Sequence, residues 1–219
     1  AVEGLAIAIS SSDNTYGIAI EVNCETDFVA INNDFSTFAN NLAKFALDNK
    51  IADKDALLAS TFEGKVLSEL LLEKTSVIGE KIDVSNYALL SSEGVAAYNH
   101  GANRIGVLVA LNSNDEAALQ AGRDLAMQIA AMNPVSVRED DVDEATKQKE
   151  FEIGKEQALA EGKPEAIIEK IAQGKLQKFF KDNTLLNQQF VKDNSITVAK
   201  YLDSVNKGLT VASFKRIAI

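Results

Sequence analysis

Apolar residues near the start of the chain form two short stretches that are separated by turn-forming residues. Gly4–Ile9 and Tyr16–Asn23 are rich in Ile, Val and Ala, and the segment between them reads Ser-Ser-Ser-Asp-Asn-Thr. Short apolar runs on either side of a Ser, Asn and Asp cluster are typical of two strands joined by a turn. We therefore expect a β-hairpin at this end of the chain.

Helical spacing of apolar residues begins after this hairpin and recurs along the chain. Residues 34–49 place Phe, Leu and Ala three or four positions apart, which predicts a helix with Asp34 as its N-cap. A second such pattern predicts a helix over 62–77 that Gly79 ends. The remaining predicted elements are helices at 54–59, 115–132 and 196–205 and strands at 81–90, 94–98, 105–111 and 209–219.

An internal repeat pairs a strand with a following helix. Gly17–Asn23 resembles Gly106–Asn112, and the helices that follow lie at 35–49 and 119–133. The strands are offset by 89 residues and the helices by 84, so the first copy carries five additional residues. These fall within Cys24–Asn33. Two copies of one pattern predict two related modules, and an insertion in one copy suggests a functional loop.

The predicted fold class is α+β, with two duplicated antiparallel-sheet-plus-helix subdomains at 1–92 and 93–219. Residues 139–181 differ from both, because they are rich in charge and carry only a narrow apolar stripe. Gly162 and Pro164 interrupt this segment, and Gly favours the end of one helix while Pro favours the first position of the next. We expect an inserted antiparallel helical hairpin (coiled coil).

Composition and charge restrict the classes of partner. The 219 residues include 22 Lys and Arg against 32 Asp and Glu, a net charge of −10. Phosphate backbones and anionic lipids repel such a chain, so we expect neither direct nucleic-acid binding nor membrane association. The single cysteine excludes an internal disulfide and favours a reducing, cytoplasmic location. Because the chain starts without Met or a signal-peptide pattern, we expect a fragment or a processed chain.

Few residues offer catalytic chemistry. Cys24 and His100 are the only cysteine and histidine, too few for a structural zinc site. No nucleophile-elbow, Walker A or dinucleotide-binding motif occurs. Cys24 is most simply a small buried residue, and His100 a turn residue bonded to nearby backbone. We expect no metal, no cofactor and no enzymatic activity, with a thiol enzyme using both residues as an alternative.

The additional residues of the first copy contain Thr26-Asp27-Phe28-Val29, for which two interpretations are open. In the first, Asp27 caps the coming helix while Phe28 and Val29 pack that helix onto the core. In the second, Phe28 is an exposed aromatic residue on a short rigid loop, a shape suited to the pocket of a partner protein.

The same residues carry a resemblance to a known family. Glu-Val-Asn-Cys-Glu-Thr-Asp-Phe-Val-Ala, at 21–30, resembles the signature of elongation factor Ts, the guanine-nucleotide exchange factor for elongation factor Tu. Ile78-Gly79-Glu80 and the segment from Tyr98 to Val109 resemble two further family elements. The resemblance covers essentially the whole chain. It implies a core of two α+β subdomains with a coiled-coil protrusion.

The resemblance also has departures. Family members begin with a small three-helix domain that also binds the partner, and many bacterial members end with a short helical module. Nothing in this sequence corresponds to either, so we expect the core of an exchange factor. Ile31 stands where a basic residue is usual.

The resemblance implies exchange of guanine nucleotide on elongation factor Tu, with Asp27 and Phe28 inserted between two helices of its GTPase domain. The insertion would displace the region that holds Mg²⁺ and the phosphates. A structural or scaffolding subunit of the same fold is the alternative, and a homodimer through the helical hairpin is left open. The residues implied as contacts with elongation factor Tu are Thr26, Asp27, Phe28, Val29, Ile78, Gly79, His100 and Gly101.

Overall fold

The computed structural model describes residues 3–219 of the chain. The chain divides into two compact units. The first contains the chain up to Ala131 and again from Val205 to Ile219, and the second contains Met132–Ser204. The predicted subdomain boundary between residues 92 and 93 divides the chain differently and stays a prediction.

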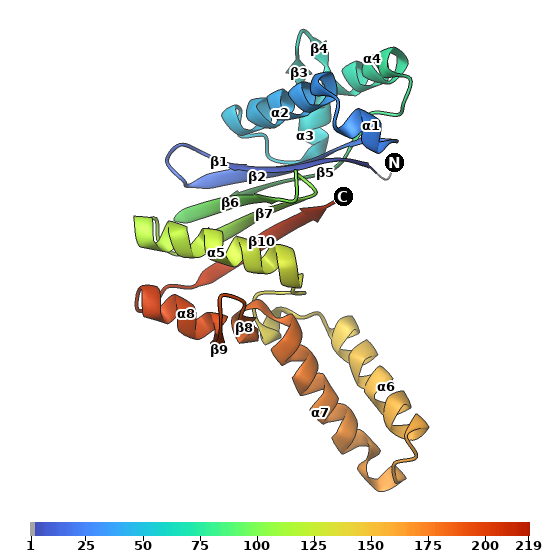
Figure 1. The fold of residues 1–219 in the computed structure, drawn as a ribbon, viewed down its shortest axis with the longest axis vertical. Helices are drawn as coiled ribbons and strands as arrows, with labels where there is room; N and C mark the ends of the chain where they lie inside the picture. The colour runs from blue at the N-terminus through green and yellow to red at the C-terminus, as the bar shows by residue number, and fades with distance from the viewer. Residues whose placement is uncertain (1–2) are drawn as a thin grey trace. The chain divides into compact units, whose positions relative to one another are not determined.

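The first unit is built on two three-stranded antiparallel sheets, which agrees with the predicted α+β class (Figure 1). One sheet has the order β1-β2-β5 and the other the order β10-β7-β6. In both, a hairpin is followed by a helix and then by a strand on the far side of the hairpin's second strand. The strands are β1 (Glu3–Ser10), β2 (Tyr16–Cys24), β5 (Asp83–Ser91), β6 (Gly94–His100), β7 (Ile105–Leu111) and β10 (Val211–Ala218).

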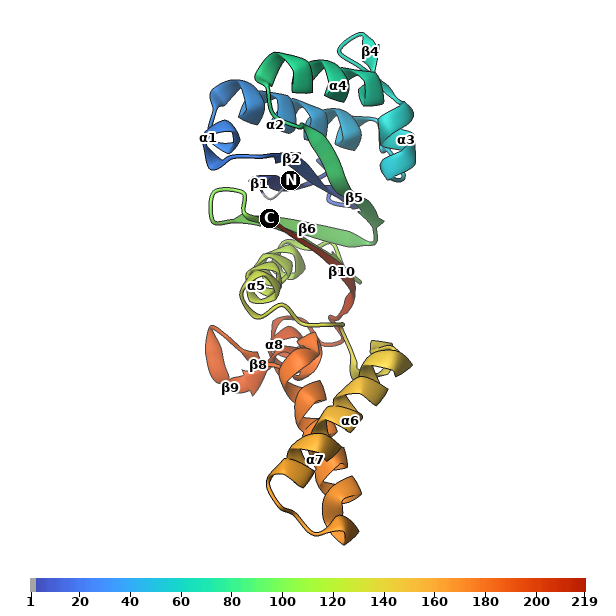
Figure 2. The same cartoon turned by 90° about the vertical axis from the view of Figure 1, so that its right-hand side faces the viewer.

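Helices cover the outer face of each sheet. α2 lies over the first sheet and α5 over the second (Figures 1 and 2). Under α2, alternate residues of the predicted hairpin, such as Ile18 and Ile20, pack against Phe35 and Leu42. The elements that complete this unit are α1 (Asp27–Ala30), α2 (Asn33–Asp48), α3 (Lys54–Ala59), β3 (Thr61–Phe62), β4 (Lys65–Val66), α4 (Leu67–Ile78) and all but the last residue of α5 (Glu116–Met132).

Small residues lie where the inner faces of the two sheets meet. Ala6, Ala8 and Ala19 of the first sheet form one buried cluster with residues of the second sheet, among them Leu108. A Cβ on Gly106 would lie 3.3 Å from the backbone nitrogen of Ala8, so the two backbones approach closely at this point. Alternation along β1 and β2 therefore buries both faces, with large residues toward α2 and small residues toward the second sheet.

The helix predicted over 62–77 begins later than the apolar spacing indicated. α4 starts at Leu67, and Phe62 belongs to the two-residue strand β3, which pairs with β4. Glu63 and Gly64 form the turn between them, both with positive φ. A two-residue turn of this kind matches the twist of a hairpin, and Gly64 adopts it without strain. Residues 61–66 therefore form a hairpin and not the first turn of the helix.

Helix ends correct one prediction and confirm another. The N-cap of α2 is Asn32 and not Asp34, because the side chain of Asn32 accepts a hydrogen bond from the backbone N–H of Asp34. Asp34 lies in the first turn, where a carboxylate still interacts favourably with the helix dipole. Gly79 ends α4 as predicted, in the left-handed conformation with φ of 82°.

The second unit contains two long helices that run antiparallel beside each other (Figure 2). A Cβ on Gly154 of one helix would lie 3.2 Å from Cα of Ala172 in the other, so the helices are close at that level. Gly162 has positive φ in the turn, and Pro164 is the N-cap of the second helix, one residue before the predicted position. The elements are α6 (Glu144–Ala160), α7 (Glu165–Asn183), β8 (Gln189–Phe190), β9 (Asp193–Thr197) and most of α8 (Val198–Val205).

Candidate partner-binding site

The additional residues after β2 form a single turn of helix, α1. Thr26 is its N-cap, and the Thr26 hydroxyl accepts a hydrogen bond of 3.3 Å from the backbone N–H of Val29. Asp27, the cap in the first interpretation, instead lies exposed in the first turn. Ala30 is buried and Val29 packs against the core below α2. One side of α1 is thus attached to the first sheet and its helices.

The other side of α1 is apolar and faces solvent. Phe28 is 78% exposed and Ile31, at the C-cap, is 79% exposed. Residues three positions apart lie on one face of a helical turn, so the two side chains form an apolar projection. The interpretation in which Phe28 packs its helix onto the core is therefore wrong. Ile31 was not among the predicted contacts. The signal in the sequence was an apolar residue directly after the signature, where a basic residue is usual.

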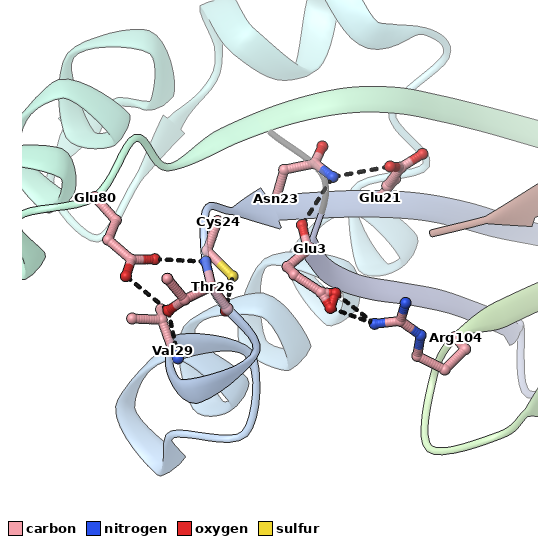
Figure 3. Close-up of polar contacts among 8 residues, drawn as sticks. All are labelled: Glu3, Glu21, Asn23, Cys24, Thr26, Val29, Glu80 and Arg104. Atoms are coloured by element: carbon pink, nitrogen blue, oxygen red, sulfur yellow. Dashed lines mark hydrogen bonds and ion pairs between the residues drawn. The ribbon is translucent and has the colours of Figure 1, made fainter.

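Glu80 connects this turn to the end of α4. One carboxylate oxygen accepts hydrogen bonds of 3.0 Å from the backbone N–H groups of Glu25 and Thr26. The other accepts a bond of 2.7 Å from the Thr26 hydroxyl (Figure 3). In return, the Glu25 carboxylate accepts a bond of 3.0 Å from the backbone N–H of Lys81. The structure thereby brings the predicted Ile78–Gly79 segment beside the predicted Thr26–Val29 segment.

The hydrogen bonds to Glu80 also set its protonation. They stabilise the ionised form, and the Thr26 hydroxyl contributes most, so the pKa of Glu80 lies below its ordinary value. Glu80 is therefore ionised at neutral pH and can accept all three bonds. Glu80 appeared in the sequence only as the last residue of a motif. The contact with Thr26 could not be read there, because 54 residues separate the two.

The predicted His100–Gly101 segment lies on the second sheet, at the turn between β6 and β7. Nδ1 of the exposed His100 ring is 2.8 Å from the Tyr98 hydroxyl, so its partner is a side chain and not the expected backbone. Gly101 has φ of 63° and starts a left-handed stretch that fits a tight turn. His100 thus faces solvent at the turn, and its ring bonds to the Tyr98 hydroxyl.

The residues that follow this turn tie it to the first sheet. The Ala6 N–H donates to the Asn103 carbonyl over 2.8 Å. Nη1 of Arg104 donates to both carboxylate oxygens of Glu3, at 2.9 Å each (Figure 3). A hollow of about 280 Å³ is lined by residues 102–104 of this turn and by residues of α1 and its C-cap, such as Asp27 and Ile31. The turn that follows His100 and Gly101 therefore lies across this hollow from α1, although neither predicted residue lines it.

Comparison with known proteins gives this surface its context. The family model described as Elongation factor TS matches residues 25–219. The chain belongs to the elongation factor Ts family. Elongation factor Ts of Flavobacterium psychrophilum is 46% identical over 217 residues, which cover 99% of this chain and 78% of that protein. Elongation factor Ts of Porphyromonas gingivalis is 40% identical over 220 residues, which cover 100% and 79% of the two chains.

One further residue, Cys24, bears on the chemistry of this elongation factor Ts family chain. Cys24 is buried, and its thiol donates to the Thr26 carbonyl over 3.3 Å. Burial, followed by the negative charges of Glu80, Glu3 and Glu25, raises the pKa of Cys24 to about 11. The thiol is thus protonated at neutral pH, which argues against the thiol-enzyme alternative.

Metal-binding clusters and membrane-spanning helices are absent from the described residues. Among residues 3–219, no group of three or more His, Cys, Asp and Glu side chains could hold a metal ion. Within the same range, every helix is too short or too polar to cross a bilayer.

Proposed function

We propose that this chain is a guanine-nucleotide exchange factor for elongation factor Tu in translation elongation. Its membership of the elongation factor Ts family supports the proposal. A factor that binds the nucleotide-free partner more tightly than the nucleotide-bound partner must weaken nucleotide binding by the same factor. This mechanism requires no acid, base or nucleophile, so the chain acts as a binding protein and not as an enzyme.

The observation that carries this proposal is the exposure of Phe28 on an anchored turn. A ring that is 78% exposed gains about 1.5–3 kcal/mol when a partner buries it. Because Phe has few rotatable bonds and α1 is already ordered, little entropy is lost on binding. Phe28, with Asp27 beside it, enters between two helices of the GTPase domain and displaces the region that holds Mg²⁺ and the phosphates.

The other predicted residues divide into contacts and supports. Ile78 and Gly79 touch the same domain of elongation factor Tu, and His100 with Gly101 braces it from the second sheet. Thr26 and Val29 act mainly by fixing α1, since one caps the turn and the other packs against the core.

The architecture supports two further parts of the proposal. The strands of the internal repeat, β2 and β7, are both middle strands, and each continues toward a helix that covers its own sheet. This supports two subdomains that arose by duplication. The α6–α7 pair, with its close approach at Gly154, supports an antiparallel coiled coil.

Release of a fluorescent GDP analogue from elongation factor Tu tests the proposal. We expect the chain to accelerate release in a concentration-dependent and saturable manner, and the spontaneous release rate in its absence is the control. Binding to elongation factor Tu without faster release would contradict exchange and favour the scaffolding alternative. His100→Ala should lower the stimulated rate moderately without unfolding the chain.

A further inference from the structure

Glu80, in the short connection after α4, accepts three hydrogen bonds. Its two oxygens take the backbone N–H groups of Glu25 and Thr26 and the hydroxyl of Thr26, at 2.7–3.0 Å. The reciprocal bond from Lys81 to Glu25 closes the arrangement from the other side. We call these four bonds the Glu80 clasp. It joins two segments that are more than fifty residues apart in the chain.

α1 requires such support because of its length. It contains four residues, and one turn of helix is unstable by itself because forming the first turn fixes several residues for a single hydrogen bond. Its own helical bonds are few: Val29 N–H to the Thr26 hydroxyl, Ala30 N–H to the Thr26 carbonyl, and Ile31 N–H to the Asp27 carbonyl. Two of these three acceptors belong to Thr26. Fixing Thr26 therefore supports the start of the turn, from which the rest of α1 continues.

We propose that Glu80 is a positioning residue for nucleotide exchange, which holds Thr26 so that α1 presents Phe28 in its binding orientation. The inference rests on the proposed function, and it deepens it by adding a residue that does not touch the partner. Through the clasp, the Thr26–Val29 and Ile78–Gly79 segments behave as one rigid surface. Loss of the clasp does not alter the Phe28 side chain itself. It leaves α1 poorly ordered in the free protein, so α1 must become ordered during binding.

Two substitutions separate the charge of Glu80 from its shape. Glu80→Ala removes every acceptor of the clasp that Glu80 supplies. Glu80→Gln keeps an amide oxygen for the two backbone N–H groups, and the Thr26 hydroxyl can rotate to accept from the amide NH₂. These bonds lack the ionic component, which makes them roughly half as strong. Glu69→Ala, at an exposed position in the first turn of α4, is the matched control.

Two measurements follow each variant. The first is amide hydrogen exchange of the segment 25–33, which reports the order of α1 in the free protein. In Glu80→Ala we expect the amides of Val29, Ala30 and Ile31 to exchange about tenfold faster or more, whereas Glu80→Gln gives an intermediate rate and Glu69→Ala the rate of the unsubstituted chain. The second is release of a fluorescent GDP analogue from elongation factor Tu over a range of factor concentrations.

In the release experiment, the ordering of α1 during binding should weaken affinity more than the maximal rate. For Glu80→Ala we expect about a tenfold rise in the concentration that gives half-maximal release, with the rate at saturation within about twofold. In a Phe28→Ala background, adding Glu80→Ala should have little further effect on release, because the positioned side chain is already gone.

Several outcomes would overturn the proposal. These are unchanged amide exchange in Glu80→Ala, an additive effect with Phe28→Ala, or global unfolding of both Glu80→Ala and Glu80→Gln, which would make Glu80 a general stability residue. If the unsubstituted chain does not accelerate release of the GDP analogue from elongation factor Tu, the proposed function is wrong. Amide exchange still reports on the clasp in that case, so the two failures are distinguishable.

Discussion

The two middle strands of the first unit lead into their helices through connections of very different character. After β2, the first connection (residues 25–32) forms α1 and leaves Phe28 and Ile31 exposed. After β7, the second connection (residues 112–115) reads Asn-Ser-Asn-Asp and contains no apolar residue. The sheets share one topology, so the difference lies in the connections themselves.

The side chains of the second connection bond to their own unit. The Asn114 amide lies 2.9 Å from the Glu93 carbonyl and 3.0 Å from the Asp13 carbonyl, to which it donates. The Asp115 carboxylate accepts from the Ala118 N–H and so caps α5. This connection stabilises the chain around it. The first connection instead receives support from Glu80 and exposes apolar area. Under the proposed function, contact with the partner therefore lies in a segment that the shared topology of the two sheets does not require.

Phe28→Ala should produce the largest difference between the effects of substitutions in the two connections. The ring is 78% exposed, so its removal should leave the melting temperature close to that of the unsubstituted chain. Stimulated GDP release should fall at least about tenfold, which corresponds to roughly 1.4 kcal/mol of lost partner contact. Thermal unfolding and stopped-flow release measure the two quantities. A large fall in melting temperature with normal release by the folded protein would show that the first connection is structural.

Asn114→Ala should have the opposite signature in the second connection. Loss of its hydrogen bonds should lower the free energy of unfolding by about 1 kcal/mol, or about 2–4 °C in melting temperature. GDP release per folded molecule should stay unchanged. Slower release at equal stability would place this connection in the partner interface and remove the contrast.

Ile31→Ala should have a smaller effect than Phe28→Ala on the same face of α1. Ile31 is smaller than Phe28 and lies at the edge of the projection. Its truncation should lower the rate of stimulated GDP release by roughly threefold, with no change in stability. Leu159→Ala, at a 60% exposed position on α6, is the control for loss of an exposed apolar side chain. Equal effects of Ile31→Ala and Leu159→Ala would confine the contact to Phe28.

Acid should weaken both connections slightly. The pKa values of Glu80 and Asp115 are lowered, chiefly by the Thr26 hydroxyl and the Ala118 N–H respectively. A lowered pKa means that the stabilisation is complete above the ordinary values of 4.5 and 3.8 and is lost as the pH falls through the lowered values.

Amide exchange of Val29 and Ala118, corrected for intrinsic rates, should therefore accelerate as the pH falls below the ordinary values of 4.5 for Glu80 and 3.8 for Asp115. Glu80→Gln should abolish this dependence at Val29 and preserve it at Ala118. A response at Val29 that survives Glu80→Gln would mean that another group controls the first connection.

Patterns within a few residues of each other were sufficient for most of the fold. The Ser-rich turn between apolar runs predicted the hairpin of β1 and β2, and Gly79 predicted the end of α4. The errors arose where two local patterns competed. Phe62 and Val66 have helical spacing, but Glu63-Gly64 between them favours a turn, and the turn determines the structure.

The site was predictable in its residues and not in its arrangement. The five additional residues of the first copy indicated where a functional loop lies. For Phe28, the sequence left two interpretations open: a side chain packed onto the core, and a side chain exposed for a partner. Exposure decided between them. The bonds from Glu80 to Glu25 and Thr26 depend on how α4 returns to the first sheet, and no local pattern encodes a contact between residues 54 or more positions apart.

The small residues between the two sheets have a mechanical consequence. Alanine has no side-chain rotamers to change, and Gly106 brings backbone against backbone, so this contact has little compliance. Under the proposed function, Phe28 presses on elongation factor Tu from one sheet and His100 from the other. The close contact between the sheets limits how far these two points can move relative to each other. A partner whose two binding surfaces have the matching separation can therefore make both contacts without the cost of deforming the first unit.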